Sequence, residues 1–327
     1  MPLLPSPDAP AAPELLPSLE ECRSLRAGLL RPLPEISARY FYDDTGSALF
    51  EQITHTDAYY PTRTELAILE RNGSEILAAV RPRHLVELGS GSGRKIRLVL
   101  DAWAASGCAR ESVTMLDINA SFLASSIQAL VRDYPDLRFS GILGDFTRDL
   151  SRLGPGGSRL ILFFAGTLGN LYPAERRAFF LAVARQMAPG DALLVGVDLV
   201  KDRARLETAY NDPEGITAAF NRNALLVLNA RFDANFDPTA FAHRAFYDAE
   251  NAWIEMRLRA LRPVSVSIPM ADLYLHLREG AEIRTEISCK FTPASFAAAA
   301  SEGGLAVVDW RTDPEGLFAL ALLRIAR

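Results

Sequence analysis

The middle of the chain alternates short apolar runs with longer segments in which apolar residues recur every three or four positions. The short runs predict buried strands, and the longer segments predict amphipathic helices between them. Strands that alternate with helices at this spacing form a parallel, doubly wound sheet with right-handed crossovers. The predicted strands are 84–88, 113–118, 137–143, 159–164 and 192–199, and the predicted helices are 95–105, 121–134 and 173–187.

The pattern changes on both sides of this block. Helical patterns precede it, and after about residue 200 the runs suggest antiparallel strands and a terminal hairpin. A parallel sheet that ends in an antiparallel hairpin resembles the class I methyltransferases, which use S-adenosylmethionine (SAM). The flanking elements are predicted helices at 20–30, 47–53, 217–229 and 293–301, predicted strands at 245–268 and 283–291, and the hairpin of 305–310 and 317–325.

We therefore predict an α/β fold of the class I SAM-methyltransferase type. Its Rossmann-like, doubly wound sheet would end in an antiparallel hairpin and carry a substrate-binding α+β cap domain. The predicted divisions are a flexible Pro-rich tail at 1–19, the N-terminal part of the cap at 20–65, a SAM-binding core at 66–200, a substrate-binding insertion at 201–285, and the end of the core sheet at 286–327.

Composition and charge narrow the class of partner. The 327-residue chain has a net charge of −5, so it has no general electrostatic attraction for nucleic acid or anionic membranes. No apolar run reaches membrane-spanning length, and the N-terminal segment lacks the pattern of a secretory signal. Its three cysteines and four histidines are scattered, which argues against disulfides and metal sites. We expect a cytoplasmic monomer that acts on a small molecule, without a metal, nucleic-acid or membrane partner.

A Gly-rich turn follows the first predicted strand. It reads ELGSGSG, which places Glu87 at the strand end and Gly89, Gly91 and Gly93 before a helix. Glycines let the backbone turn tightly and approach a ligand closely. Dinucleotide-binding proteins use GxGxxG, whereas the glycines here run GxGxG. The spacing therefore favours SAM over NAD.

Two later strands also end in an acidic residue. Asp117 ends the second strand, and Asp145 follows the third, with Phe146 next to it. A carboxylate at the first of these positions accepts hydrogen bonds from ribose hydroxyls. At the second, in a SAM site, it would accept from the adenine amine while Phe146 flanks the ring. Either residue alone suits an ordinary turn, but three acidic strand ends beside GxGxG predict a SAM site.

Motifs along the whole chain resemble the histidine-specific N-α-methyltransferases of ergothioneine biosynthesis. Members of that family convert histidine to its trimethyl betaine, hercynine. Several motifs lie outside the generic SAM-binding core, so the resemblance is to a family and not only to a fold. The matching stretches, within about residues 40 to 320, are FYDDTGSALFEQIT, YYPTRTE, LVELGSGSGRK, GDF, GTLGN, DLVKD, GITAAFNRN, IEMRLRA, RTEISCKF and WRTDPEG.

The resemblance implies two adjoining sites. The SAM site would contain Tyr42, Gly89, Lys95, Asp117, Asp145 and Phe146, beside the Glu87 and Gly91 of the turn. The L-histidine site would contain Tyr59, Asn170, Tyr210, Met256, Glu286 and Ser288, with Tyr59 and Asn170 in catalytic roles.

Glu286 and Ser288 are the residues that would select histidine. They lie two apart on a predicted strand, so their side chains face the same way. A carboxylate and a hydroxyl can accept from, and donate to, the two nitrogens of an imidazole. Asn170 would hold the amino or carboxylate group, and Tyr59 would bind the amine. From spacing alone, Asn170 is equally a turn residue, and isolated tyrosines are more often packing residues.

Three other functions compete with this one. The same chemistry on another free amino acid would need only small changes around Met256 and Glu286. An NAD-dependent oxidoreductase is disfavoured by the GxGxG spacing. A non-catalytic module that binds SAM or an amino acid is disfavoured because Asp117 and Asn170 are both present.

Overall fold

A computed structural model describes residues 16–91 and 93–326 of the chain. Most of the predicted tail at 1–19 lies outside the described residues. Its last positions begin a helix, because Ser18 caps α1 (Leu19–Leu29) through a capping box with Glu21.

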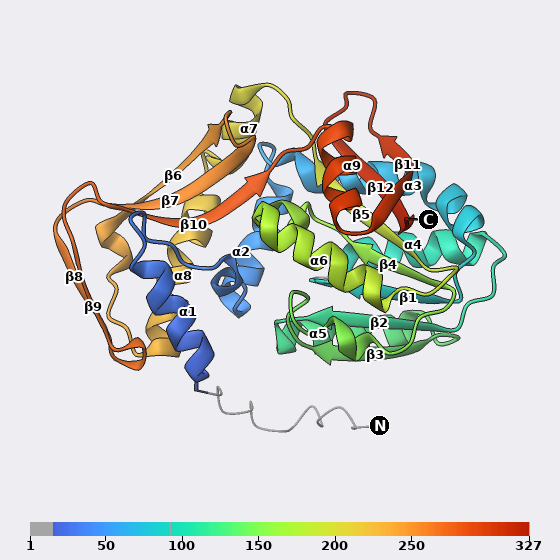
Figure 1. Cartoon of the computed structure of the whole chain (residues 1–327), viewed down its shortest axis with the longest axis horizontal. Coiled ribbons are helices and arrows are strands. Elements are labelled where there is room, and N and C mark those ends of the chain that lie inside the picture. Colours follow the sequence, from blue (N-terminus) through green and yellow to red (C-terminus); the bar gives the residue numbers. More distant parts are fainter. Residues whose placement is uncertain (1–15, 92, 327) are drawn as a thin grey trace.

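The core of the molecule is a seven-stranded sheet in the order β11-β12-β5-β4-β1-β2-β3 (Figure 1). Strands β1 to β5 pair in parallel, and β12 pairs antiparallel with both β5 and β11. This is the class I methyltransferase fold predicted from the sequence. The strands are β1 (His84–Leu88), β2 (Ser112–Asp117), β3 (Arg138–Leu143), β4 (Arg159–Phe163), β5 (Ala192–Asp198), β11 (Leu305–Thr312) and β12 (Phe318–Ile325).

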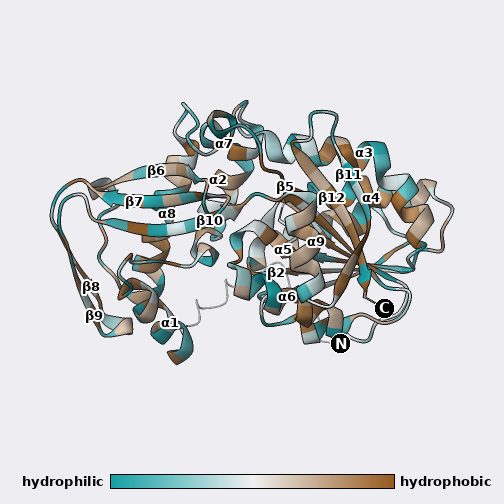
Figure 2. Cartoon of the chain, turned by 45° about the horizontal axis from the view of Figure 1, so that its top comes forward, coloured by the Kyte–Doolittle hydropathy of each residue, from teal (hydrophilic) through white to brown (hydrophobic). Residues whose placement is uncertain are grey.

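Helices cover both faces of this sheet, whose strands are mostly hydrophobic (Figure 2). In β4, Leu160 and Leu162 belong to one apolar cluster, while Ile161 and Phe163 belong to the other. Continuous apolar runs are the pattern of a parallel sheet buried on both faces. Helices α3 (Tyr60–Val80), α4 (Arg94–Ala105) and α5 (Ala120–Asp133) contribute to one cluster, and α6 (Pro173–Gln186) and α9 (Pro293–Glu302) contribute to the other.

A second body, the cap, lies beside the carboxyl ends of the parallel strands (Figure 1). A single apolar cluster joins residues between Cys22 and Tyr60 with residues between Leu206 and Ile283. The cap elements are α1, α2 (Asp44–His55), α7 (Arg203–Tyr210), α8 (Ile216–Phe232), the antiparallel strands β6 (Phe241–Asp248), β7 (Trp253–Ala260) and β10 (Glu282–Cys289), and the hairpin of β8 (Val264–Ile268) and β9 (Leu273–Leu277). Short 3₁₀ helices occur at η1 (Ala38–Phe41), η2 (Leu150–Leu153), η3 (Thr167–Asn170), η4 (Pro238–Ala240) and η5 (Pro269–Ala271).

The structure corrects the sequence prediction in the cap. The run 245–268, predicted as strand, contains parts or all of three strands, and α7 and β9 were not predicted. The division between residues 285 and 286 is also wrong, because it cuts β10. That strand pairs with β7 in the cap, and Cys289 lies opposite Trp253. An apolar strand pattern predicts a strand, but it does not say which sheet the strand joins.

The chain passes between cap and core at neighbouring places. One is Tyr60, where the N-terminal part of the cap enters α3. The others run side by side after β5 and after β10: Phe291 donates its N–H to the Asp198 carbonyl, and Val200 donates to the Phe291 carbonyl. This short parallel pairing ties the exit from the core to the return from the cap.

Gly196 in β5 should be intolerant of a side chain. A methyl group there would overlap Glu65 Oε1, and Glu65 is fully buried, where it pairs with Lys95 and accepts from the Ala165 N–H. We expect Gly196→Ala to lower the free energy of unfolding by on the order of 3 kcal/mol, measured by urea denaturation.

A double-mutant cycle tests whether the overlap with Glu65 causes the loss of stability in Gly196→Ala. In a Glu65→Ala background, Gly196→Ala should cost less than about 1 kcal/mol, because the overlapping carboxylate is gone. An equal cost in both backgrounds would show that the clash with Glu65 is not the reason.

Candidate functional site

A cavity of about 770 Å³ lies between the cap and the carboxyl ends of the core strands. Ligands of open α/β sheets bind at this edge. All of the site residues predicted from the sequence line this one cavity: Tyr42, Tyr59, Glu87, Gly89, Gly91, Lys95, Asp117, Asp145, Phe146, Asn170, Tyr210, Met256, Glu286 and Ser288. Their individual roles stay predictions.

The Gly-rich turn forms part of the core wall of the cavity. Gly89 and Gly91 adopt φ values of 74° and 48°, which L side chains rarely adopt, and a Cβ at either would meet no atom within 4 Å. Asp117 holds this turn from the end of β2, since its Oδ2 accepts the Gly91 N–H at 2.9 Å. Its Oδ1 accepts the Asn119 N–H at 2.9 Å. The turn is therefore fixed with open space beside its glycines.

Glu87, at the end of β1, carries a polar atom without a partner. The residue is 2% exposed, and among the described residues no donor reaches its Oε2. Burial raises the pKa of this carboxyl well above its usual value, and the nearby Lys95 cation opposes the shift only in part. A buried oxygen of this kind needs a hydrogen-bond donor, and the cavity that it faces can supply one from a ligand.

The outer part of the core wall is built around Asp145. Its Oδ1 accepts from the Thr147 N–H at 2.8 Å and from the Thr147 hydroxyl at 2.6 Å. Arg39 of the cap lies 3.9 Å from Oδ2, and the Phe146 ring packs on Phe163 with centroids 4.9 Å apart. Lys95 has a different environment, because its ammonium pairs with Glu65 Oε2 at 2.6 Å. Its contribution to the cavity is the charge that it places near Glu87.

The cap wall carries a second carboxylate that can accept a hydrogen bond from a ligand. Glu286 on β10 lies opposite Met256 on β7, and both face the cavity. Burial raises the pKa of Glu286 to about 7, although the Lys290 cation and a hydrogen bond from Asn170 act against the shift. The carboxyl therefore changes charge near neutral pH, so a ligand donor can decide its state.

Polar and aromatic groups connect the two walls. Asn170, in η3 of the core, donates from Nδ2 to the Ile287 carbonyl of the cap at 2.9 Å. The Tyr59 and Tyr210 rings meet edge to face, with centroids 6.1 Å apart. Burial raises the pKa of Tyr59 well above its usual value, so Tyr59 is a neutral phenol at physiological pH. It can donate or accept a hydrogen bond, but it is not a phenolate base.

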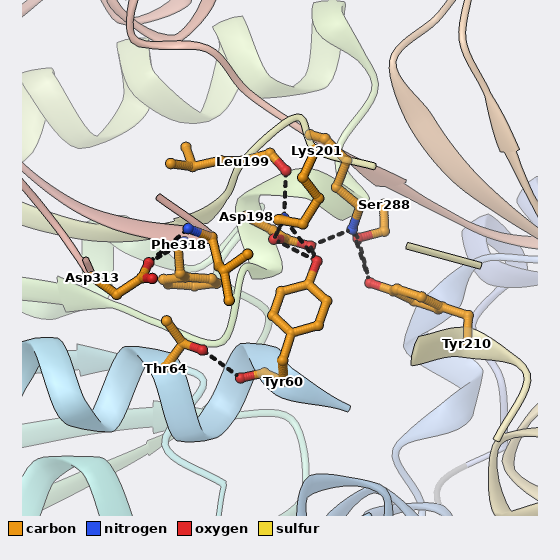
Figure 3. A network of polar contacts seen from close by, with 11 residues as sticks. Tyr60, Thr64, Asp198, Leu199, Lys201, Tyr210, Ser288, Asp313 and Phe318 are labelled. Atoms are coloured by element: carbon orange, nitrogen blue, oxygen red, sulfur yellow. Dashed lines mark hydrogen bonds and ion pairs between the residues drawn. The ribbon is translucent and has the colours of Figure 1, made fainter. Parts of the chain in front are cut away.

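A buried network behind Tyr210 and Ser288 was not predicted (Figure 3). Its centre is Asp198, which pairs with both Lys201 and Lys290 and accepts from the Tyr60 hydroxyl at 2.9 Å. These residues stand in the motifs YYPTRTE, DLVKD and RTEISCKF, which carry the family resemblance. The available sequence signal for this network was Asp198, a charged residue at the end of the otherwise apolar strand β5. Spacing alone did not show that the three motifs meet.

The part of the chain that the structure describes contains neither a membrane-spanning helix nor a metal-binding cluster. No helix in residues 16–91 and 93–326 is long and apolar enough to cross a membrane. In the same residues, no group of three or more His, Cys, Asp or Glu side chains is arranged to hold a metal ion.

Comparison with known proteins gives consistent matches. The model of a family described as histidine-specific, SAM-dependent methyltransferases matches residues 21–325. A histidine N-α-methyltransferase from Mycolicibacterium smegmatis is 43% identical over 300 residues, which cover 92% of this chain and 93% of that protein. Ergothioneine biosynthesis protein 1 from Schizosaccharomyces pombe is 30% identical over 244 residues, which cover 71% of this chain and 31% of that protein.

A solved structure supports the fold. The crystal structure of a SAM-dependent methyltransferase from Clostridium acetobutylicum superposes with a TM-score of 0.50 at 10% identity. The superposition covers 85% of this chain and 98% of that one. At this identity the likeness concerns the fold alone.

The Glu286 carboxyl should lower the stability of the ligand-free protein as pH rises. Its pKa is about 7 in the folded state against an ordinary 4.5, so between these values the folded state holds a proton that the unfolded state has lost. Stability then falls through this window, by on the order of 3 kcal/mol in total. We expect Glu286→Gln to be more stable than the wild type at pH 8, with no difference below pH 4.5, by urea denaturation.

Glu282 on the same strand is a matched control. Burial raises the pKa of Glu282, but hydrogen bonds from Arg257 and Arg244 outweigh burial and hold it below its usual value. Glu282→Gln should therefore lose stability near neutral pH, and this loss should vanish on acidification. A stabilised Glu282→Gln, or a destabilised Glu286→Gln at pH 8, would contradict this account.

Proposed function

Because the chain belongs to the family of histidine-specific, SAM-dependent methyltransferases, we propose that it trimethylates the α-amino nitrogen of free L-histidine. The product would be hercynine, formed in the first step of ergothioneine biosynthesis. The observation that carries the proposal is the pairing of two walls in one cavity. A Gly-rich turn with the unpartnered Glu87 faces a cap wall that bears Glu286 and Ser288.

The core wall fits SAM. We assign Glu87 to the amino group of SAM, because this ligand cation would give the buried Oε2 the donor that it lacks. Asp117 is assigned to the ribose hydroxyls. Among the described residues its Oδ2 accepts from the Gly91 N–H and the Ser90 hydroxyl, whereas its Oδ1 accepts from the Asn119 N–H and keeps a free lone pair. Asp145 and Phe146 are assigned to the adenine, with Tyr42 as a further lining residue from the cap side. When bound, SAM supplies an activated methyl group on a sulfonium.

The cap wall fits the imidazole of histidine. Glu286 accepts from one ring nitrogen, and Ser288 donates to the other. Met256 lies in register with Glu286, is 2% exposed, and closes the apolar side of this subsite. Asn170 and Tyr210 are assigned to the amino-acid backbone of the substrate, because they stand where core and cap meet.

Methyl transfer requires a neutral amine in line with the methyl group. The nitrogen forms a bond to the methyl carbon while the carbon–sulfur bond breaks and its electron pair returns to sulfur. In the first two rounds the nitrogen then loses a proton, and the third round leaves a quaternary ammonium. A free α-amino group has a pKa near 8, so much of it is protonated at neutral pH and a positioned acceptor is needed to take its proton. In the first two rounds the Tyr59 oxygen accepts the proton of the amine while its own hydroxyl proton passes to water, so the phenol stays neutral. Alignment of the two ligands across the walls supplies much of the rate.

The aromatic lining suits a product that becomes a fixed cation. Phe220 lies 5.9 Å from the Tyr42 ring and 6.0 Å from the Phe50 ring, and Tyr59 lies 6.2 Å from Phe50. All of these rings line the cavity. Aromatic faces stabilise alkylated ammonium groups through cation–π interactions.

We also propose a compartment and an assembly state. Cys22, Cys108 and Cys289 are all free thiols, as expected for the reducing cytoplasm. Both walls of the cavity come from the same chain, and we propose a monomer. The net charge of −5 gives no support for a nucleic-acid or membrane-surface partner.

The first test is mass spectrometry of the protein incubated with SAM and each of the twenty free amino acids. We expect histidine alone to gain up to three methyl groups, on the α-nitrogen. Methylation of another amino acid instead would leave the SAM site standing but overturn the role of Glu286 and Ser288. Oxidation of a substrate with NAD, or binding without turnover, would support the competing functions.

Two variants should distinguish the ligand that each wall binds. Glu87→Gln should weaken SAM binding by about tenfold or more, because a charge-assisted hydrogen bond is lost. Glu286→Ala should weaken histidine binding to a similar degree while the SAM affinity changes less than about twofold. Isothermal titration with each ligand measures both, and equal losses of both affinities in Glu286→Ala would disprove the imidazole role.

A further inference from the structure

A chain of hydrogen bonds links a buried carboxylate to two hydroxyl groups of the cavity (Figure 3). The Lys290 side chain is fully buried and does not line the cavity. Its ammonium lies 2.9 Å from Asp198 Oδ2, and it donates to Ser288 Oγ at 2.8 Å and to Tyr210 Oη at 3.1 Å. Tyr210 in turn donates to Ser288 Oγ at 2.8 Å. Ser288 and Tyr210 both line the cavity.

In this hydrogen-bond network, the donors of Lys290 and the lone pairs of Ser288 Oγ are all used. An ammonium has three N–H donors and no acceptor, so Lys290 is saturated and both hydroxyl oxygens must accept from it. Ser288 Oγ accepts from Lys290 and from Tyr210, which fills both of its lone pairs. What Ser288 has left is its own O–H, for which the described residues provide no acceptor. The cavity is where that hydrogen atom finds one.

We propose that Lys290, held by Asp198, is a positioning residue that fixes the Ser288 hydroxyl as a hydrogen-bond donor into the cavity. This inference rests on the proposed function, in which the acceptor is the unprotonated ring nitrogen of histidine. Glu286 supplies the acceptor for the other ring nitrogen. One fixed donor and one acceptor match a neutral imidazole, which has one N–H and one bare nitrogen.

The charge of Lys290 keeps the Ser288 hydroxyl in its role as a hydrogen-bond donor into the cavity. Burial lowers the pKa of Lys290, but the Asp198 carboxylate and Tyr210 outweigh burial and hold the pKa above its usual value. Lys201, the second cation on Asp198, has its pKa lowered to about 8 by burial. Lys290 therefore stays protonated across the physiological range, and Ser288 receives the same donor throughout. Its charge also polarises both hydroxyls, which strengthens the donor presented to the substrate.

Lys201 gives a matched control within the same network. It pairs with Asp198 and donates to the Tyr60 hydroxyl at 2.8 Å and to the Leu199 carbonyl. Lys201→Met and Lys290→Met thus remove the same charge from the same carboxylate. Lys290→Met alone removes donors to Ser288 and Tyr210, so a purely structural or electrostatic role would affect both variants alike.

The experiment measures the KM for histidine, kcat and the dissociation constant for SAM in the full-length protein. We expect Lys290→Met to raise the KM for histidine by about tenfold or more, and Lys201→Met by less than about threefold. The SAM dissociation constant should change less than about twofold in both. In a Ser288→Ala background, Lys290→Met should raise the KM by less than about threefold, because the hydroxyl it positions is absent.

Equal KM increases in the two lysine variants, or an undiminished effect of Lys290→Met beside Ser288→Ala, would overturn the positioning role. These outcomes are distinct from failure of the proposed function, in which the wild type itself would not methylate histidine. Should Lys290→Met fail to fold, Lys290→Gln keeps one donor group at similar reach. It should raise the KM for histidine by several-fold with unchanged SAM affinity, and an unchanged KM would also overturn the proposal.

Discussion

The carboxylate of Asp198 sits where the chain passes between core and cap. Tyr60 begins the first helix of the core, Lys201 follows β5 on the way out, and Lys290 follows β10 on the way back; all three contact Asp198. Burial raises the pKa of Asp198, but the two lysine cations outweigh burial and hold it below its usual value. Breaking any such buried pair leaves an uncompensated charge, which is costly. The two walls of the cavity are therefore held at one spacing by charge pairing as well as by apolar packing.

Four carboxylates in and behind the cavity walls fall into two groups with different consequences. Asp198 and Glu65 are saturated by cations or N–H donors, and they hold segments of the fold together. Glu87 and Glu286 face the cavity with raised pKa values, and each has capacity for a further donor. The second group makes the empty protein less stable than it could be. Such a cost is typical of sites arranged for a ligand and not for the apo fold.

In both walls of the cavity, a carboxylate at the end of a strand orients the groups that face the ligand through short chains of hydrogen bonds. On the core wall, Asp117 holds the Gly-rich turn directly by accepting the Gly91 N–H. On the cap wall, Asp198 acts at one remove, through Lys290, on Ser288 and Tyr210. In both cases a strand-end carboxylate orients the groups that face the cavity. The turn can thus stay rich in glycine, and the cap groups Ser288 and Tyr210 can stay uncharged, without loss of order.

The sequence by itself determined the parallel sheet and the Gly-rich turn, because both depend on local pattern. Most residues of the cavity were implied by motifs shared with a family, and local pattern alone did not select them. Strand β1 was predicted at its exact bounds, and the core helices α4, α5, α6 and α9 lie within a residue of their predicted bounds. Membership of β10 in the cap sheet was decided only by tertiary structure, because an apolar run is compatible with either sheet. The meeting of Tyr60, Asp198, Lys201 and Lys290 was likewise not predictable from the sequence, since these residues lie up to 230 positions apart. Pairing between such distant charges is set by how the two bodies pack, and no periodicity in the chain encodes it.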